Sequence, residues 1–212
     1  MSSILSFDEM NRLGMPQRSM PYEQYFGEMD LTKGQIEDRT EFAQRMEDIV
    51  RTALILMLLQ YEFGIDDAEF AAEQMKRQYG NLVTGLAAGS ILVNDYIPQM
   101  VDRYVESTMA RPTDPYTFSE DRIRLTAEND ANTVYNEDEY VDGIGRGFTR
   151  KMWVTMHDSH VRETHAEVDG EILPIDEYYE VGGSLMRFPK DFSMSPSPEE
   201  TVNCRCSIKY LR

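Results

Sequence analysis

The sequence predicts an α+β protein, in which a helical N-terminal region precedes a small α+β C-terminal module with a short antiparallel sheet. Apolar residues recur at helical spacing along several segments before the glycine-rich stretch "DGIGRG". After Gly147, short segments alternate between apolar and polar residues, as β-strands do. With 212 residues, 41% of them hydrophobic, the chain is long and apolar enough to bury a core.

The N-terminal part divides into two regions. Residues 1–31 are expected to form an irregular arm, because prolines and glycines interrupt a polar stretch. Residues 32–112 are expected to form a helical domain. Its first helix begins at Thr32, which has Gln35 three residues later in the spacing of a capping box, and it ends before Gly64.

Two further helical segments complete this domain. Asp66 is expected to open a helix that ends before Gly80. The next helical region covers Leu82–Met109, and Pro98 is expected to kink or divide it because proline cannot donate the backbone hydrogen bond. The two prolines of "ARPTDPY" then mark a linker.

The C-terminal module is placed at residues 117–212. It starts with a helix whose capping box is formed by Thr117 and Glu120. The segment "KMWVTM" predicts a strand, the Asp169-Gly170 dipeptide predicts a hairpin turn, and "TVNCRCSIKYL" predicts the last strand.

The charge of the chain restricts its partners. With 38 acidic and 21 basic residues, the formal net charge is -17, and the arginines are scattered. Such a surface repels phosphate backbones, so a basic protein surface is a more natural partner than nucleic acid. The N-terminus is charged too early for a signal peptide, and the apolar run "ALILMLLQY" is too short to span a bilayer, so no membrane association is expected.

The cysteines and histidines gather in two short blocks, "HDSHVRETH" and "NCRC". Thiolates and imidazoles are the ligands that zinc prefers, usually four in a tetrahedron, and residues two apart on a strand share a face. Cysteines at this spacing rarely bond to each other, which favours a reducing compartment. Zinc is therefore the one cofactor that the residues suggest. The candidate ligands are His165, Cys204, Cys206 and Asp158, with His157 as an alternative fourth ligand.

Other interpretations of these residues stay open. Cys204 and Cys206 can pack as small apolar residues beside a strand. Asp158 can cap the following helix and pair with Arg162. A Cys/His pair can make a thiol nucleophile with its base, and His, Asp and Arg can make an acid–base nuclease. Since the chain contains no Gly-rich phosphate loop, GxSxG or HExxH, we expect no enzyme and assign no catalytic residue.

The ordered motifs "AENDAN", "HDSHVRETH", "VDG", "FPKD" and "NCRC" resemble the phage Mu F-like minor head protein family, also called phage head-morphogenesis proteins. The resemblance covers about residues 118–207. Its matched positions are Arg122, Glu128, Asn132, Trp153, Asp158, Arg162, His165, Gly170, Pro189, Asp191, Asn203, Cys204, Arg205 and Cys206. Of these, the residues expected to be structural are Trp153, Arg162, Gly170, Asn203 and Arg205.

The resemblance implies a minor head (capsid) protein of a tailed double-stranded DNA phage, acting in head morphogenesis at or near the portal. It implies the portal protein and inner capsid or scaffold proteins as partners, with indirect DNA contact in some members. The implied location is the virion or procapsid interior, and the host cytoplasm during assembly. The alternative function is a nuclease or other enzyme that acts on phage or host nucleic acid.

Overall fold

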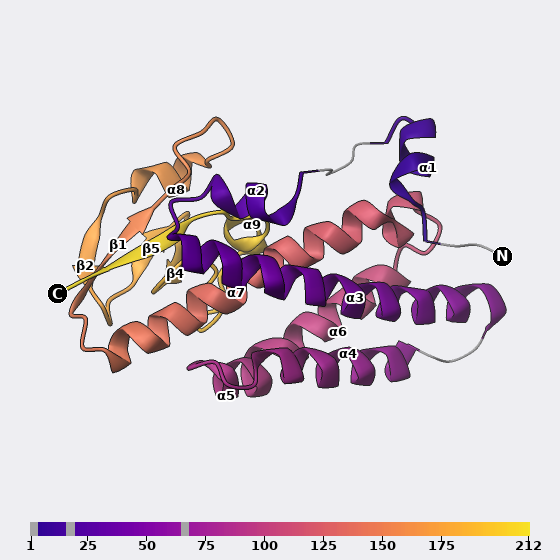
Figure 1. Ribbon diagram of the computed structural model, residues 1–212, viewed down its shortest axis with the longest axis horizontal. Coiled ribbons are helices and arrows are strands. Elements are labelled where there is room, and N and C mark those ends of the chain that lie inside the picture. Colours follow the sequence, from indigo (N-terminus) through magenta and orange to yellow (C-terminus); the bar gives the residue numbers. More distant parts are fainter. Residues whose placement is uncertain (1–3, 16–19, 65–67) are drawn as a thin grey trace. The chain divides into compact units, whose positions relative to one another are not determined.

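The computed structural model describes residues 4–15, 20–64 and 68–212. The chain forms two compact units, and neither is one continuous stretch of sequence. Unit 1 comprises Met1–Met20, Glu41–Gly85 and Gly89–Glu128, and unit 2 comprises Pro21–Thr40, Leu86–Ala88 and Asn129–Arg212. Long helices precede the strands in the chain (Figure 1), so the predicted α+β class is confirmed.

The helices before the first strand are α1 (Phe7–Arg12), α2 (Tyr22–Gly27), α3 (Lys33–Phe63), α4 (Ala68–Val83), α5 (Gly89–Ile91), the π-helical turn η1 (Leu92–Tyr96), α6 (Ile97–Met109), the 3₁₀ turn η2 (Pro115–Phe118) and α7 (Glu120–Gly145). The later elements are β1 (Arg150–Val154), α8 (Glu163–Glu167), β2 (Ile172–Pro174), β3 (Tyr179–Val181), β4 (Ser184–Met186), α9 (Pro198–Thr201) and β5 (Ser207–Leu211).

The N-terminal arm, expected to be irregular, contains the helices α1 and α2 among its described residues. Ser6 and Glu9 form a capping box at the start of α1, with the Ser6 N–H donating to the Glu9 carboxylate at 2.8 Å. Pro21 directly precedes α2, where the lack of an N–H costs nothing because the first N–H groups of a helix have no partner inside it. Pro21 therefore borders a short helix instead of preventing one.

The capping box predicted at the start of α3 is confirmed, since the Thr32 N–H donates to Gln35 Oε1 at 2.8 Å. The helix ends at Phe63, and Gly64 follows with a φ of 67°. The predicted helix start at Asp66 lies outside the described residues. The following helix does not end before Gly80 but continues to Val83. A glycine inside a helix costs only about 1 kcal/mol, which burial of its neighbours in the helix outweighs.

As predicted, the helical region changes its geometry next to Pro98. The turn η1 ends at Tyr96, and Pro98 lies at the start of α6. A π-helical turn before a proline is a local adjustment that accommodates the missing N–H. The helix α6 then packs on α4 in unit 1.

The predicted cap of α7 is wrong. Thr117 lies in the tight turn η2, which Pro115 begins, and its hydroxyl donates to the Arg111 carbonyl at 2.8 Å. Ser119 caps the helix instead, and its Oγ accepts the Arg122 N–H at 3.3 Å. The turn uses the residues that the sequence pattern had assigned to the first turn of the helix.

In unit 2, the central strand β1 pairs antiparallel with β2 on one side and β5 on the other (Figure 1). Trp153 on β1 is fully buried in the core of this unit. The turn predicted at Asp169 exists, but it connects α8 to β2 and is not a hairpin turn. Gly170 has a φ of 76°, and its N–H donates to the Trp153 carbonyl at 2.9 Å. The "NCRC" residues precede β5, and the strand begins at Ser207.

Candidate functional site

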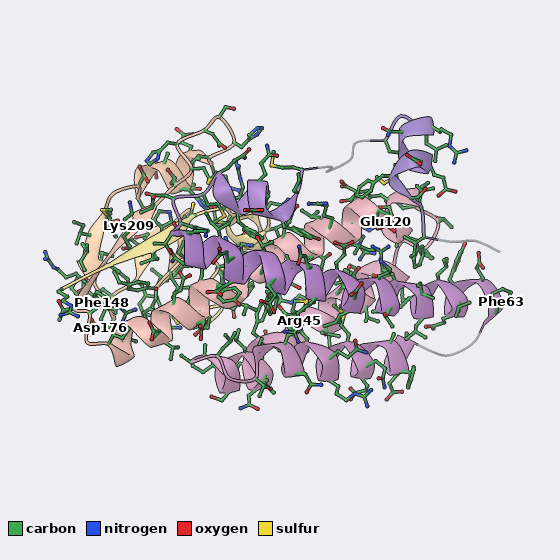
Figure 2. The ribbon with its side chains drawn as sticks, in the orientation of Figure 1. Arg45, Phe63, Glu120, Phe148, Asp176 and Lys209 are labelled. Carbon is green, nitrogen blue, oxygen red and sulfur yellow. The ribbon has the colours of Figure 1, made fainter. Side chains whose placement is uncertain are left out.

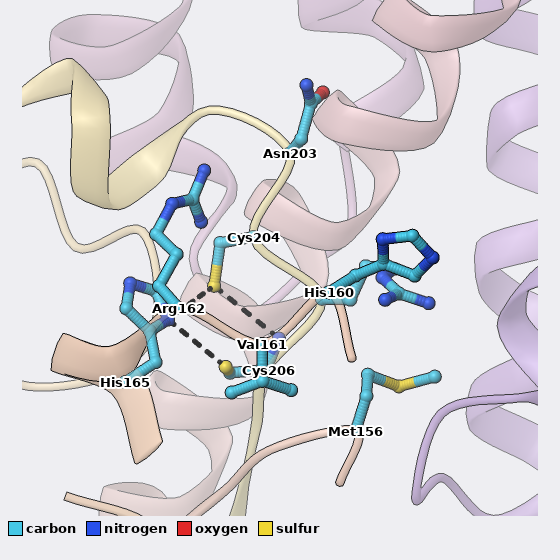
Figure 3. A pocket seen from close by; sticks show the side chains of 9 residues that line it. Met156, His160, Val161, Arg162, His165, Asn203, Cys204 and Cys206 are labelled. Atoms are coloured by element: carbon cyan, nitrogen blue, oxygen red, sulfur yellow. Dashed lines mark hydrogen bonds between the residues drawn. The ribbon is translucent and has the colours of Figure 1, made fainter. Parts of the chain in front are cut away.

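Three predicted ligands meet in the core of unit 2. Among the described residues, His165, Cys204 and Cys206 form a group whose ligand atoms all lie within 4.8 Å of one another. The Nδ1 atom of His165 is 3.3 Å from the Cys206 sulfur and 3.6 Å from the Cys204 sulfur (Figure 3). All three side chains are buried. The structure thus brings together residues that lie about 40 positions apart in the sequence.

Local structure sets the direction of each side chain. His165 is on α8, and its ring meets the ring of Trp153 edge-on, with centroids 5.8 Å apart. Asn203 has a φ of 58°, a left-handed conformation that asparagine tolerates better than most residues. It turns the chain so that both cysteine side chains face His165. The Cys206 N–H also contacts the Cys204 sulfur at 3.4 Å.

Two asparagines of α7 hold the backbone of this segment. The side-chain amide of Asn132 donates to the carbonyls of Cys204 and Cys206, at 3.1 and 3.5 Å. The amide of Asn136 donates to the carbonyls of Pro189 and Cys206, at 3.0 and 3.4 Å. The "AENDANTVYN" segment therefore positions "NCRC". Asn132 was among the matched positions, but Asn136 was missed.

Glu200 is a second residue that sequence reasoning missed. It lies on α9, its side chain is 10% exposed, and its Oε2 is 3.0 Å from His165 Nε2. The Thr164 hydroxyl donates to the same oxygen at 2.8 Å. The carboxylate holds the Nε2 side of the ring and leaves Nδ1 facing the sulfurs. In the sequence, Glu200 resembles an ordinary acidic residue in the first turn of a short helix, so no signal distinguished it.

Contacts within the group shift the pKa values of His165 and both cysteines. Burial lowers the pKa of His165, but its contact with the Cys204 thiolate outweighs this and raises it. A hydrogen bond from Cys206 lowers the pKa of Cys204 well below its ordinary value, and the same contact, together with burial, raises the pKa of Cys206. Burial also lowers the pKa of Lys190, to about 8. In the group alone, the contact between Cys204 and His165 thus favours the charged forms of both side chains.

The remaining candidate ligands lie outside this group. The Asp158 carboxylate accepts from Arg205 at 2.6 Å and from the His160 N–H at 2.9 Å. His157 is exposed and contacts Asp169 at 2.7 Å. The pairing of Asp158 with a residue at i+4 assumed a helix over both positions. The segment is instead a turn, because α8 begins only at Glu163.

The arginine expected to pair with Asp158 has a different partner. Arg162 lies at the N-cap of α8, and its guanidinium donates to the Val202 carbonyl at 2.5 Å. This bond connects the start of α8 to the segment that leads into "NCRC". Arg162 and Arg205 thus both connect the histidine block to the cysteine block, Arg162 through the Val202 carbonyl and Arg205 through Asp158.

A small pocket borders the group. Its volume is about 20 Å³, which is room for one water molecule. His165 and both cysteines form one side of it, and Met156 and His160 lie on another (Figure 3). The three ligand atoms are therefore next to a space that a fourth, small ligand fits.

Comparison with known proteins gives one family. A sequence model of the family described as phage Mu protein F like protein matches residues 71–209. Among curated proteins, NAD(+)--arginine ADP-ribosyltransferase EFV of Enterococcus faecalis is 27% identical over 128 residues, which is 60% of this chain and 24% of that protein. The match therefore spans about a quarter of the relative's length. The search of solved structures gave no match. Among the described residues, none of the helices combines the length and apolar character needed to cross a membrane.

Proposed function

The chain belongs to the phage Mu protein F like family, and on this premise we propose that it is a minor head protein of a tailed double-stranded DNA phage that acts in head morphogenesis at or near the portal. The observation that carries the proposal is the family match over residues 71–209. This range includes β1, α8 and the "NCRC" segment, and so contains the whole buried group of His165, Cys204 and Cys206.

The proposed partners are the portal protein and the inner capsid or scaffold proteins, inside the virion or procapsid and in the host cytoplasm during assembly. The net charge of -17 supports a basic protein surface as the partner, because opposite charges steer association and choose between partners. The same charge disfavours direct binding to DNA.

The part of α3 that belongs to unit 1 has an exposed apolar stripe. Ile55, Leu59 and Phe63 follow one another at four-residue spacing near the end of α3, with exposed fractions of 43, 37 and 61%. Figure 2 labels Phe63 at this end of the helix. Residues four apart share a helix face, and an amphipathic helix presents such a face to a partner groove. We place the contact with the portal protein on this stripe.

Replacing Leu59 by glutamate is expected to weaken binding to the purified portal protein at least about tenfold, because it puts a charge in the centre of the apolar stripe. Binding is measured by titration of portal protein with the full chain. Gln44→Glu is the matched control, since it adds the same charge at an exposed polar position of α3 and is expected to bind like the wild type. Equal affinities for the two variants would contradict the placement of the contact.

The enzymatic alternative has a direct test. The transferase named above aligns with this chain over only 24% of its own length, so we propose no transfer activity here. Purified full chain is expected to leave DNA and RNA intact, with added zinc and with EDTA. Cleavage that disappears in a His165→Ala variant would show that assembly is not a complete account of the function.

A further inference from the structure

We propose that His165 Nδ1, Cys204 Sγ and Cys206 Sγ bind a zinc ion, that Glu200 orients the imidazole, and that a water molecule in the adjoining pocket completes the tetrahedron. This proposal does not depend on the assembly role. It replaces Asp158, the fourth ligand expected from the sequence, with a small exchangeable ligand.

The distances within the group match the edges of a zinc tetrahedron. Zinc bonds are about 2.3 Å long to sulfur and 2.0–2.1 Å to nitrogen. At tetrahedral angles, these lengths put a ligating sulfur and a ligating nitrogen about 3.6 Å apart. His165 Nδ1 lies 3.3 and 3.6 Å from the two sulfurs. All three atoms also lie within 4.8 Å of one another, so an ion between them needs only small side-chain shifts.

The partner of Nε2, the second ring nitrogen of His165, independently indicates that Nδ1 binds a metal ion. A histidine that binds a metal through one nitrogen almost always donates the other N–H to a carboxylate, a carbonyl or water. Glu200 Oε2 is 3.0 Å from His165 Nε2, and the same oxygen accepts from the Thr164 hydroxyl at 2.8 Å. This arrangement stabilises the tautomer with a free lone pair on Nδ1, which is the atom that faces both sulfurs.

Charge balance also favours the ion. Two thiolates and one divalent zinc sum to zero, and burying a charge is costly unless it is compensated. Without the ion, a second thiolate would add an uncompensated negative charge to a group in which all three side chains are at most 4% exposed. Zinc is the divalent metal whose usual ligands are thiolate and neutral imidazole in a tetrahedron.

The adjoining pocket indicates which ligand takes the fourth position around the zinc ion. Asp158 is held by Arg205 and lies outside the group. The space beside the ligand atoms measures about 20 Å³, which admits one water molecule. An ion at this position joins α8, which carries His165, to the segment before β5, which carries both cysteines.

The experiment measures zinc in the purified full chain by mass spectrometry, and then replaces zinc by cobalt(II). The expected result is about one zinc per chain, and cobalt spectra with sulfur-to-metal charge-transfer bands and the intense visible bands of a tetrahedral site. Cys204→Ser and Cys206→Ser are each expected to lose the ion. Asp158→Asn and His160→Gln are expected to keep it with an unchanged cobalt spectrum. Loss of the ion in either of these two variants would overturn the assignment of the fourth ligand.

The role of Glu200 is tested in variants that keep all three ligands. Glu200→Gln is expected to bind zinc about 10- to 100-fold more weakly, with the cobalt charge-transfer bands retained. Glu199→Gln is the matched control, because its side chain is exposed and next in sequence, and it is expected to bind like the wild type. Equal affinities for the two would overturn the role of Glu200. A wild-type chain that takes up neither zinc nor cobalt would overturn the site and leave a hydrogen-bonded thiol–imidazole cluster.

Discussion

Replacing Arg39 by methionine is expected to lower the unfolding free energy of unit 2 by about 3–5 kcal/mol, since it removes one partner of a buried polar network. The Arg39 side chain is fully buried, and its guanidinium donates to Glu139 at 2.6 Å. It also donates to the side-chain oxygens of Asn132 and Asn136, at 3.4 and 3.3 Å. These are the asparagines that hold the "NCRC" backbone.

The cost comes from what the substitution leaves behind. Methionine fills a similar volume, but Glu139 and the two asparagine oxygens lose a donor, and a buried polar group without a partner costs about 1–3 kcal/mol. Urea unfolding followed by the fluorescence of Trp153, which lies in the core of unit 2, measures the loss. Adding Glu139→Gln to Arg39→Met is expected to recover part of it, because the unpaired charge is then gone.

Arg45→Met is the matched control on the same helix. The Arg45 side chain is 58% exposed and pairs with Glu41 only at 3.8 Å. Exposed pairs of this kind contribute about 0.3–0.5 kcal/mol, so this variant should unfold almost like the wild type. If both arginine variants lost the same free energy, the network around Arg39 would not be a principal support of this unit.

Features that depend on residues close together in the sequence could be predicted, whereas features that depend on distant residues could not. The capping box of Thr32 and Gln35 depends on residues three apart, and it was predicted correctly. The cap proposed at Thr117 depended on the same spacing and was wrong, because Pro115 starts a separate turn there. A spacing rule holds only where the backbone takes the conformation that the rule assumes, and a proline nearby can change it.

The candidate site shows the same limit. His165, Cys204 and Cys206 could be found because their residue types are rare in this chain and suit one chemistry. Glu200 and Arg39 could not, since acidic and basic residues are common and their partners lie 35 and about 100 positions away. Which charged residue is buried is decided by packing between distant segments, and no short pattern encodes it.

Replacing Asp191 by asparagine is expected to lower the unfolding free energy at neutral pH by about 3 kcal/mol, because it leaves the charge of Arg187 without its buried partner. Asp191 is fully buried and belongs to the "FPKD" motif. Its carboxylate accepts from Arg187 through the backbone N–H, Nε and Nη2, at 2.8–3.0 Å, and from the Ser193 N–H at 2.9 Å. An asparagine amide would turn N–H groups toward these donors.

The same residue predicts a pH dependence. Burial raises the pKa of Asp191, but the hydrogen bonds from Arg187 and Ser193 outweigh it and hold the pKa below the ordinary value of 3.8. At low pH the unfolded chain therefore binds the proton more readily than the folded chain does. The stabilisation is complete above about pH 4 and is lost as the pH falls through the folded pKa, with a slope of up to about 1.4 kcal/mol per pH unit.

The measurement compares urea unfolding of the wild type and Asp191→Asn between pH 7 and pH 2. The two unfolding free energies should converge as the pH falls, because a protonated Asp191 no longer differs in charge from asparagine. Asp142→Asn provides the control: Asp142 faces Arg146 at the same four-residue spacing but is 50% exposed, so this change should cost less than about 1 kcal/mol. A difference between wild type and Asp191→Asn that stayed constant down to pH 2 would mean that Asp191 supports the loop by shape alone. Convergence would show that the carboxylate charge holds the "FPKD" turn, which supplies the Pro189 carbonyl that Asn136 binds beside the cysteines.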